Sequence, residues 1–163
     1  MSKIITTHLT LDFAVEKVWL TLTGLSEYSE WNPFITSAGG ILEVGERLEV
    51  TIQPPGGRPM KFKPWVTAVE PHRYLEWLGR AGMPGIFDGR HSFTLTPLTG
   101  GRTLVQQSET FSGALVPFAG LLFARTRLGF DQMNEALGYR LGSSGENPSG
   151  SLGSGTPAAP SSR

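Results

Sequence analysis

The 163-residue chain contains no cysteine, which excludes disulfide bonds, thiol catalysis and thiolate metal sites. Charge is also scarce, at 17% of residues, and the 14 Lys+Arg are balanced by 14 Asp+Glu. A net charge near zero gives no electrostatic reason to expect nucleic acid or an anionic membrane surface as a partner. No segment approaches the roughly 20 apolar residues that span a bilayer, so we expect no membrane insertion. Residues 1–13 lack the continuous apolar block of a signal peptide, and these absences together predict a cytoplasmic protein.

The common metal, nucleotide and hydrolase motifs are absent as well. The three histidines, His8, His72 and His91, are far apart and form no HExxH or comparable ligand spacing. There is no GxGxxG or Walker A loop for a nucleotide and no GxSxG motif for a hydrolytic serine. We therefore predict neither a metal nor a cofactor.

The first third of the chain predicts one strand followed by two short helices. Apolar and polar residues alternate over residues 5–11, which is typical of a strand. Apolar residues in 15–22 follow helical spacing, and a second short helix is predicted over about 25–30. Pro33 then disfavours the helical conformation at Asn32, so the chain becomes extended at this point.

A series of strands follows, since apolar residues recur with a period of two from Phe34 onward. Together with the first strand, they predict an antiparallel sheet of about six to seven strands. Gly- and Pro-rich turns separate the predicted strands, which cover about residues 35–42, 48–52, 62–66, 75–77, 90–96 and 103–111. Pro117 suits the first turn of a final helix that runs to about Leu141. Its apolar stripe has the spacing i, i+3, i+7, i+10 and i+14: Phe123, Thr126, Phe130, Met133 and Leu137.

The composition changes abruptly after Leu141. Residues 142–163 are mostly Gly, Ser and Pro, and they cannot bury enough apolar surface to offset the entropy of ordering. The sequence therefore predicts one folded domain over 1–141 and a disordered tail over 142–163.

The last two predicted strands form the clearest hairpin, because Thr99-Gly100-Gly101 marks the turn between them. Centring the turn there pairs residue 91 with 109, 93 with 107 and 95 with 105. We interpret one face as buried because it alone has an apolar majority: His91, Phe93, Leu95, Val105, Gln107, Glu109 and Phe111. A shift of one residue in register would reverse the two faces.

Several short motifs of the chain occur in the same order and with the same spacing as in a known protein family. They are Val18-Trp19, Tyr28, Trp31-Asn32-Pro33-Phe34, Gly45-Glu46, Glu70-Pro71, Leu75-Glu76-Trp77, His91-Ser92-Phe93, Glu109-Thr110-Phe111-Ser112-Gly113 and the segment from Phe130 to Leu137. Over roughly Lys3 to Leu141 the sequence thus resembles the SRPBCC superfamily, and within it the polyketide cyclase/dehydrase-type family. The resemblance implies an α+β helix-grip fold, also called START-like or Bet v 1-like, with a curved antiparallel sheet wrapped around a long C-terminal helix. It also implies a hydrophobic cavity that binds lipids, polyketides or other apolar compounds, but no single activity.

His91 and Glu109 are the candidate catalytic residues, because the predicted register makes them cross-strand neighbours on the pocket face. A carboxylate can orient an imidazole ring, and such a pair can move a proton in a cyclisation or dehydration without a cofactor. The same pair would equally be a satisfied buried contact or an anchor for a ligand head group, and these alternatives stay open.

The candidate ligand-binding residues are the remaining large side chains that the predicted elements direct toward the pocket: Trp77, Phe87, Phe93, Gln107, Phe111, Phe123, Phe130 and Met133. For Trp77 a place in the core is an equal alternative, and Gln107 would instead face water if its strand lay at an edge. Arg125, near the edge of the helical stripe, would either meet an acidic ligand group or remain solvated or salt-bridged. Loops 54–59, 80–87 and 112–117 are expected at one end of the sheet, with the apolar second loop as an entrance.

The preferred function is binding of a small hydrophobic or amphipathic molecule, lipid- or polyketide-like, between the sheet and the C-terminal helix. The alternative is a cofactor-independent polyketide cyclase, dehydratase or isomerase that uses His91 and Glu109. A regulatory or chaperone-interacting module is a third hypothesis, for which we expect an exposed apolar patch and a filled interior. The expected partner is a small apolar molecule. A second copy of the chain, in a homodimer, is a further possible partner.

Overall fold

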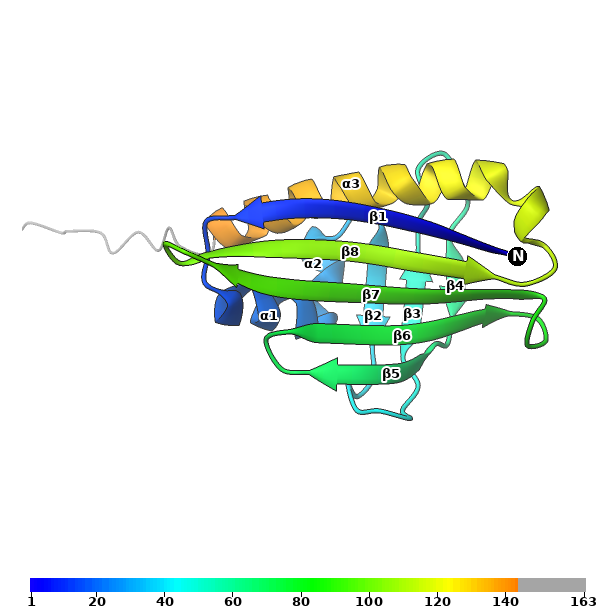
Figure 1. Ribbon diagram of the computed structural model, residues 1–163, viewed down its shortest axis with the longest axis horizontal. Coiled ribbons are helices and arrows are strands. Elements are labelled where there is room, and N and C mark those ends of the chain that lie inside the picture. Colours follow the sequence, from blue (N-terminus) through cyan, green and yellow to red (C-terminus); the bar gives the residue numbers. More distant parts are fainter. Residues whose placement is uncertain (144–163) are drawn as a thin grey trace, which may run out of the picture.

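The computed structural model describes residues 1–143 (Figure 1). The elements follow the order β1 (Ser2–Leu11), α1 (Val15–Thr23), the 3₁₀ turn η1 (Leu25–Glu27), α2 (Tyr28–Trp31), β2 (Ile35–Gly39), β3 (Glu49–Ile52), β4 (Met60–Phe62), β5 (Trp65–Glu70), β6 (Tyr74–Ala81), β7 (Phe87–Leu98), β8 (Arg102–Ser112), the 3₁₀ turn η2 (Val116–Phe118) and α3 (Gly120–Ser143). Residues 142 and 143 belong to α3, so the folded part extends slightly beyond the predicted boundary. The rest of the predicted tail lies outside the described residues.

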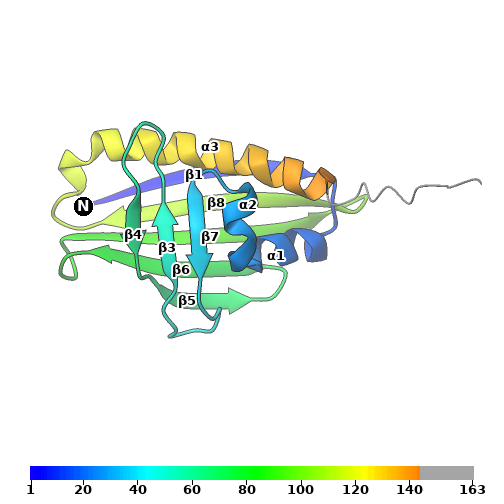
Figure 2. The same ribbon diagram turned by 180° about the vertical axis from the view of Figure 1, so that it is seen from behind.

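The strands form two antiparallel sheets, a large one in the order β1-β8-β7-β6-β5 and a small one in the order β2-β3-β4. Figures 1 and 2 show α3 running along the length of the large sheet, with the strands of the small sheet crossing one face of it. This curved arrangement around a long C-terminal helix confirms the predicted α+β helix-grip fold.

The predicted strand at 62–66 is divided between the two sheets, so residues 1–143 contain eight strands. β4 ends at Phe62 and β5 begins at Trp65, with Pro64 between them. Because Pro64 has no backbone N–H, it cannot continue the ladder of a central strand. Its carbonyl instead accepts from the Leu48 amide at 2.9 Å, and Arg47 forms an isolated bridge with Trp65. The chain therefore passes from one sheet to the other at this corner.

The predicted register of the last hairpin is confirmed. His91 lies opposite Glu109, Phe93 opposite Gln107 and Leu95 opposite Val105. The predicted inner face is also the buried one, since four of these side chains are no more than 2% exposed: Phe93, Leu95, Val105 and Gln107. Gln107 does not face water; it is fully buried, and its Nε2 donates to Met133 Sδ on α3 at 3.3 Å.

The helix α3 packs its predicted stripe against the large sheet, with Thr126, Phe130, Met133 and Leu137 all buried. Gly129 lies on the same side, and a Cβ there would overlap the ring of Phe34. The absence of a side chain at Gly129 thus serves close packing rather than space for a ligand.

The corner before β2 is held by Asn32. Its Oδ1 accepts from the backbone amides of Phe34 at 3.0 Å and Ile35 at 2.8 Å. This side-chain turn places Phe34 against α3, where its ring meets that of Phe130 edge-on at 5.6 Å.

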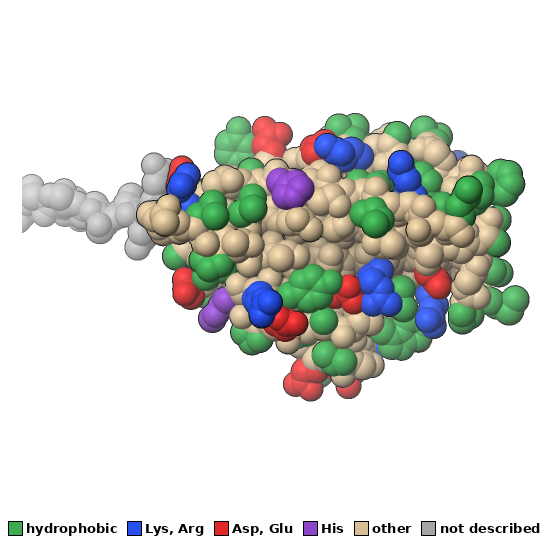
Figure 3. Space-filling model, viewed as in Figure 1, with side chains coloured by type: hydrophobic (Ala, Val, Ile, Leu, Met, Phe, Trp, Pro, Cys, Tyr) green, Lys and Arg blue, Asp and Glu red, His purple; other side chains and the backbone are tan. Residues whose placement is uncertain are grey.

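The outer face of the large sheet carries no concentration of one charge. Figure 3 shows basic and acidic side chains interspersed over this face. Within residues 1–143, no helix is both long and apolar enough to cross a membrane.

Candidate functional site

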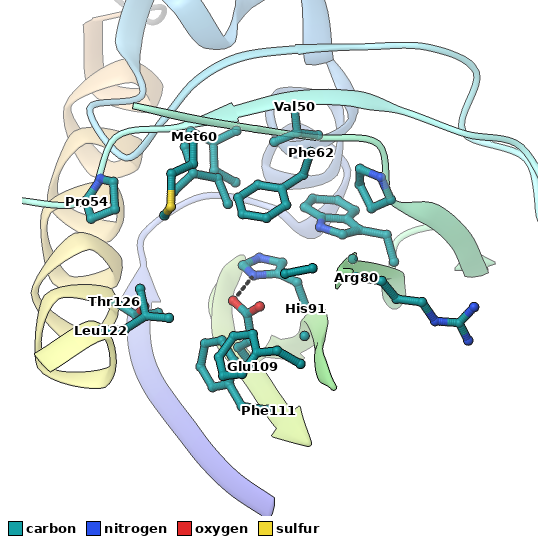
Figure 4. A pocket seen from close by; sticks show the side chains of 18 of the residues that line it. Val50, Pro54, Met60, Phe62, Arg80, His91, Glu109, Phe111, Leu122 and Thr126 are labelled. Carbon is teal, nitrogen blue, oxygen red and sulfur yellow. Dashed lines mark hydrogen bonds and ion pairs between the residues drawn. The ribbon is translucent and has the colours of Figure 1, made fainter. Parts of the chain in front are cut away.

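A cavity of about 180 Å³ lies between the two sheets and α3. The small sheet supplies an apolar wall from Val50, Ile52, Met60 and Phe62, and α3 supplies Leu122 and Thr126. The large sheet supplies the opposite wall, with His91 and Glu109 at its centre (Figure 4). The lining is apolar except for a few side chains, which is the usual composition of a small-molecule site.

His91 and Glu109 are the polar centre of the cavity. His91 Nδ1 lies 3.4 Å from Glu109 Oε2, and the two side chains are 5% and 14% exposed. The other ring nitrogen of His91, Nε2, is buried and has no hydrogen-bond partner among the described residues. A buried imidazole nitrogen without a partner is costly unless a ligand or water supplies one.

Three aromatic side chains fix the His91 ring. Trp77 stacks on it, with ring centroids 4.8 Å apart and an interplanar angle of 10°. Phe93 and Phe130 contact it edge-on, at 4.8 and 5.3 Å. The orientation of Nε2 is therefore set by packing as well as by the contact with Glu109.

Two glycines on adjacent strands leave space beside the carboxylate. Gly79 on β6 pairs with Gly89 on β7, which in turn lies opposite Phe111 on β8. A Cβ on Gly89 would come within 2.5 Å of Glu109 Oε1, whereas a Cβ on Gly79 would meet nothing closer than 3.8 Å. An alanine at 89 would therefore require the end of the Glu109 side chain to move, because Glu109 occupies the volume of the missing side chain.

The structure brings together five of the predicted site residues and separates the other five from the cavity. His91, Glu109, Trp77, Phe87 and Phe111 line it. The remaining five do not line it: Phe93, Gln107, Phe123, Phe130 and Met133. The reason is that α3 packs directly on the sheet along most of its length, so the cavity is confined to the region near the start of α3. There Phe123 supports the wall from behind, with its ring 5.0 Å from that of Phe111.

The wall formed by the small sheet was missed in the sequence. The alternation of Val50 and Ile52 correctly indicated a strand with one apolar face. The alternation did not indicate that this strand lies over the large sheet, because the contact between the two sheets joins residues far apart in the sequence. Phe62 and Met60 join the same wall because β4 pairs with β3.

A surface groove continues from the cavity toward solvent. It is lined by Pro54, Gly57, Arg58, Met60, Leu121, Leu122 and Arg125, and it shares Pro54, Met60 and Leu122 with the cavity. Figure 4 shows Pro54 and Met60 facing Leu122 and Thr126 of α3 across the space. The groove therefore lies between the 54–59 loop and the start of α3.

The other two loops that we expected near the entrance are joined to each other. The amides of Ala114 and Leu115 donate to the carbonyls of Gly85 and Ile86 at 3.0 and 3.1 Å. A Cβ on Gly113 would overlap the Ile86 carbonyl, so this close approach requires glycine. Next to this junction, Arg80 lines the cavity, and its Nε lies 3.5 Å from Asp88 Oδ1.

Residues 1–143 contain no group of three or more His, Asp or Glu side chains arranged to hold a metal ion. The side chains of the site offer apolar contact, hydrogen bonding at His91 Nε2, and proton transfer by His91 supported by Glu109.

Residues 3–137 match the model of the family described as "Polyketide cyclase / dehydrase and lipid transport". The chain belongs to this family. It is the family predicted from the short motifs, and its wider SRPBCC superfamily is likewise confirmed. A search of curated proteins finds no match.

Solved structures of the superfamily share the fold at low sequence identity. The ZhuI aromatase/cyclase from Streptomyces sp. R1128 superposes with a TM-score of 0.74 at 13% identity, over 92% of this chain and 99% of that one. A START superfamily protein from Mycobacterium smegmatis gives a TM-score of 0.67 at 18% identity, over 86% and 97%. A point mutant of norcoclaurine synthase from Thalictrum flavum gives 0.68 at 15% identity, over 90% and 98%. At these identities the likeness shows the fold alone.

Proposed function

We propose that the protein binds a small hydrophobic or amphipathic molecule in the cavity between the two sheets and α3. The observation that carries this proposal is an apolar cavity of about 180 Å³ lined by His91, whose buried Nε2 has no hydrogen-bond partner among the described residues. The family description, which includes lipid transport, supports it. The interaction-module hypothesis expected a filled interior, and the cavity favours ligand binding over it.

The size of the cavity limits the ligand. An apolar cavity of about 150 Å³ holds one benzene ring, whereas drug-sized ligands occupy roughly 300–1,000 Å³. The 180 Å³ available here therefore fits one ring or a short branched chain. A longer molecule has to extend into the adjoining groove.

The proposal is tested by titrating the ¹⁵N-labelled protein with 4-phenylbutan-1-ol, a neutral molecule with one ring. We expect saturable amide shifts on β6, β7 and β8 around Gly79, Gly89 and Phe111. Thr126→Phe places a phenyl ring in the space that the ring of the ligand would occupy and should abolish the shifts. The matched control is Thr110→Phe, which adds the same ring beside Arg90 on the outer face and should leave binding intact. A wild-type protein without saturable shifts contradicts the proposal.

Acid–base catalysis is the second candidate, favoured by the contact between His91 and Glu109. With Nδ1–H directed at the Glu109 carboxylate, Nε2 of the neutral ring is free to accept a proton. It would take that proton from a carbon next to a substrate carbonyl, leaving an enolate and an imidazolium paired with Glu109. Return of the proton to another carbon completes an isomerisation. In a cyclisation the enolate carbon instead attacks a second carbonyl of the substrate, and the resulting alkoxide takes the proton. In a dehydration the enolate expels a β-hydroxyl, which takes the proton and leaves as water, so none of these reactions needs a cofactor. The name of the ZhuI aromatase/cyclase supports this class of reaction.

His91→Phe separates the two candidates, because phenyl retains the stacking on Trp77 and removes both nitrogens. An enzyme of this kind loses turnover by about 10²–10⁴-fold when its acid–base group is removed. A carrier keeps its ligand and loses about fivefold to tenfold in affinity for an alcohol that bonds to Nε2. Turnover of a candidate substrate that survives in His91→Phe excludes His91 as the catalytic base.

A further inference from the structure

We infer that the ligand carries an anionic head group, which binds between Arg58 and Arg125 in the groove while the apolar part fills the cavity. The inference rests on the proposed ligand-binding function and names the chemical class of the ligand. A carboxylate and a phosphate share the chemistry that the two guanidinium groups would recognise.

The first observation is that the groove has two cations and no acid. Arg58 and Arg125 are its charged residues, and neither has an ion pair or hydrogen bond within residues 1–143. The other arginines of this part of the chain pair with a carboxylate or donate to a backbone carbonyl: Arg47, Arg73, Arg80, Arg90, Arg102, Arg127 and Arg140. Within residues 1–143, the two arginines without such a partner therefore both lie at the groove.

The second observation is the position of Arg125 relative to the cavity. Leu122 and Thr126, three residues before and one after it on α3, both line the cavity. Side chains three residues apart on a helix have Cβ atoms roughly 5–6 Å apart. A head group that leaves the cavity past Leu122 thus reaches Arg125 within one helical turn.

The third observation is that the 54–59 loop accommodates the Arg125 side chain. Arg125 Nη1 lies 3.5 Å from the position that a Cβ on Gly57 would occupy, and Nη2 lies 4.0 Å from that of Gly56. A side chain at Gly56 or Gly57 would reduce the space that the Arg125 guanidinium has beside the loop. Arg125 as a whole is half-buried, and its guanidinium lies beside the turn at Gly56 and Gly57, so its donors gain more from an anion than those of a fully solvated arginine would.

The test compares three probes with the same phenylbutyl body: 4-phenylbutan-1-ol, 4-phenylbutanoate and 4-phenylbutyl phosphate. Each is titrated into the ¹⁵N-labelled protein at neutral pH and low salt. We expect at least one anion to bind about tenfold more tightly than the alcohol, as one charge-assisted hydrogen bond would provide. The tighter of the two anions identifies the head group. The preference should shrink in 0.5 M salt because the groove is open to solvent.

Variants then assign the preference to the groove. Arg125→Gln and Arg58→Gln should each reduce the affinity for the anion toward that for the alcohol and leave the alcohol unaffected. Arg125→Lys keeps the charge and should retain part of the preference. The control is Arg127→Gln, on the same helix but ion-paired with Asp131 and outside the groove, which should change neither affinity.

The outcomes distinguish this inference from the proposed function. Equal binding of all three probes overturns the anionic head group and leaves cavity binding in place. Binding of none overturns both. A preference that falls equally in Arg127→Gln reflects general charge and also overturns the inference.

Discussion

Gly89 is the residue on which the geometry of the His91–Glu109 pair depends. The carboxylate lies where a side chain at 89 would be, so any substitution there displaces it. Gly79 is its cross-strand partner and has no such conflict. The two neighbouring glycines therefore differ in purpose, one making room for a functional group and the other widening the cavity.

We predict that Gly89→Ala is less stable than Gly79→Ala by about 1 kcal/mol, because the new Cβ would lie 2.5 Å from Glu109 Oε1 and the end of the Glu109 side chain has to move. The displaced carboxylate should also change the ¹H and ¹³C chemical shifts of the His91 ring, compared at a single pH. Gly79→Ala is the control, and it should be neutral or stabilising by up to about 1 kcal/mol, since glycine weakens a strand. Identical urea midpoints and identical His91 ring shifts in Gly89→Ala and the wild type would contradict a displaced carboxylate.

The helix α3 also contains one glycine that has a side chain packed against it and one that has space around it. Gly129 receives the ring of Phe34, while Gly138 has Leu11 Cδ2 at 3.8 Å from its added Cβ, an ordinary contact. Phe34 is 2% exposed and holds the end of the Asn32 turn against the helix. The fit between α3 and β2 therefore depends on one missing side chain.

We expect alanine to have opposite effects at these two positions. Gly138→Ala should stabilise by up to about 1 kcal/mol through helix propensity. Gly129→Ala gains the same propensity but forces Phe34 out of its site, so its net effect should be destabilising by about 1–3 kcal/mol. Urea denaturation of both variants measures the difference, and a stabilised Gly129→Ala would mean that Phe34 repacks without strain.

On the outer face of the large sheet, Glu76 is the acceptor of three hydrogen bonds. Tyr74 Oη, Thr67 Oγ1 and Arg90 Nη1 donate to it at 2.6, 2.7 and 2.6 Å. Burial acts to raise the pKa of Glu76, but these bonds outweigh it and hold the pKa below its ordinary value. The pKa of the Tyr74 hydroxyl is raised, first by burial and then by the bond to Glu76.

This arrangement predicts a pH-dependent contribution to stability from β5, β6 and β7. Because the pKa of Glu76 is lower in the folded protein, its stabilisation is present above the pKa of the unfolded chain and is lost as the pH falls through the folded value. Glu76→Gln should therefore be less stable than the wild type by about 1–3 kcal/mol at pH 7, with the difference shrinking toward pH 3. Urea denaturation between pH 7 and 3 measures this, and a difference that is constant with pH would contradict it.

At the same scale, the sequence allowed some elements to be predicted and not others. The β7–β8 register was accessible because Gly100 and Gly101 locate the turn and only one face has an apolar majority. The stripe on α3 was accessible because helical spacing is a local pattern. The division at Pro64 and the crossing of the small sheet were not, since both depend on contacts between segments far apart in the chain.

For the whole molecule, the cavity is a departure from close packing. A sealed, empty cavity weakens a protein by about 24 cal/mol per Å³, so a closed void of 180 Å³ would cost about 4 kcal/mol; this cavity opens to the groove, and that figure is therefore an upper bound. That is a large part of the 5–15 kcal/mol by which domains are typically stable. The sequence predicted a hollow interior through its family resemblance, but not its extent. Phe93, Gln107, Phe130 and Met133 fill most of the space beneath α3, and only the contacts among them show this.

A substitution that fills the cavity should therefore abolish ligand binding and maintain or raise the stability of the unliganded protein. Thr126 lines the cavity and is 4% exposed, so the phenyl ring of Thr126→Phe fills part of an apolar void, and the unliganded variant should melt at or above the wild-type temperature. Ligand at 100 times its dissociation constant stabilises a protein by about 2.7 kcal/mol, which for this size raises the melting temperature by roughly 5–10 °C. Scanning calorimetry with and without 4-phenylbutan-1-ol should show that rise in the wild type and in Thr110→Phe but not in Thr126→Phe. A Thr126→Phe protein that still gains the full rise would place the ligand outside this cavity.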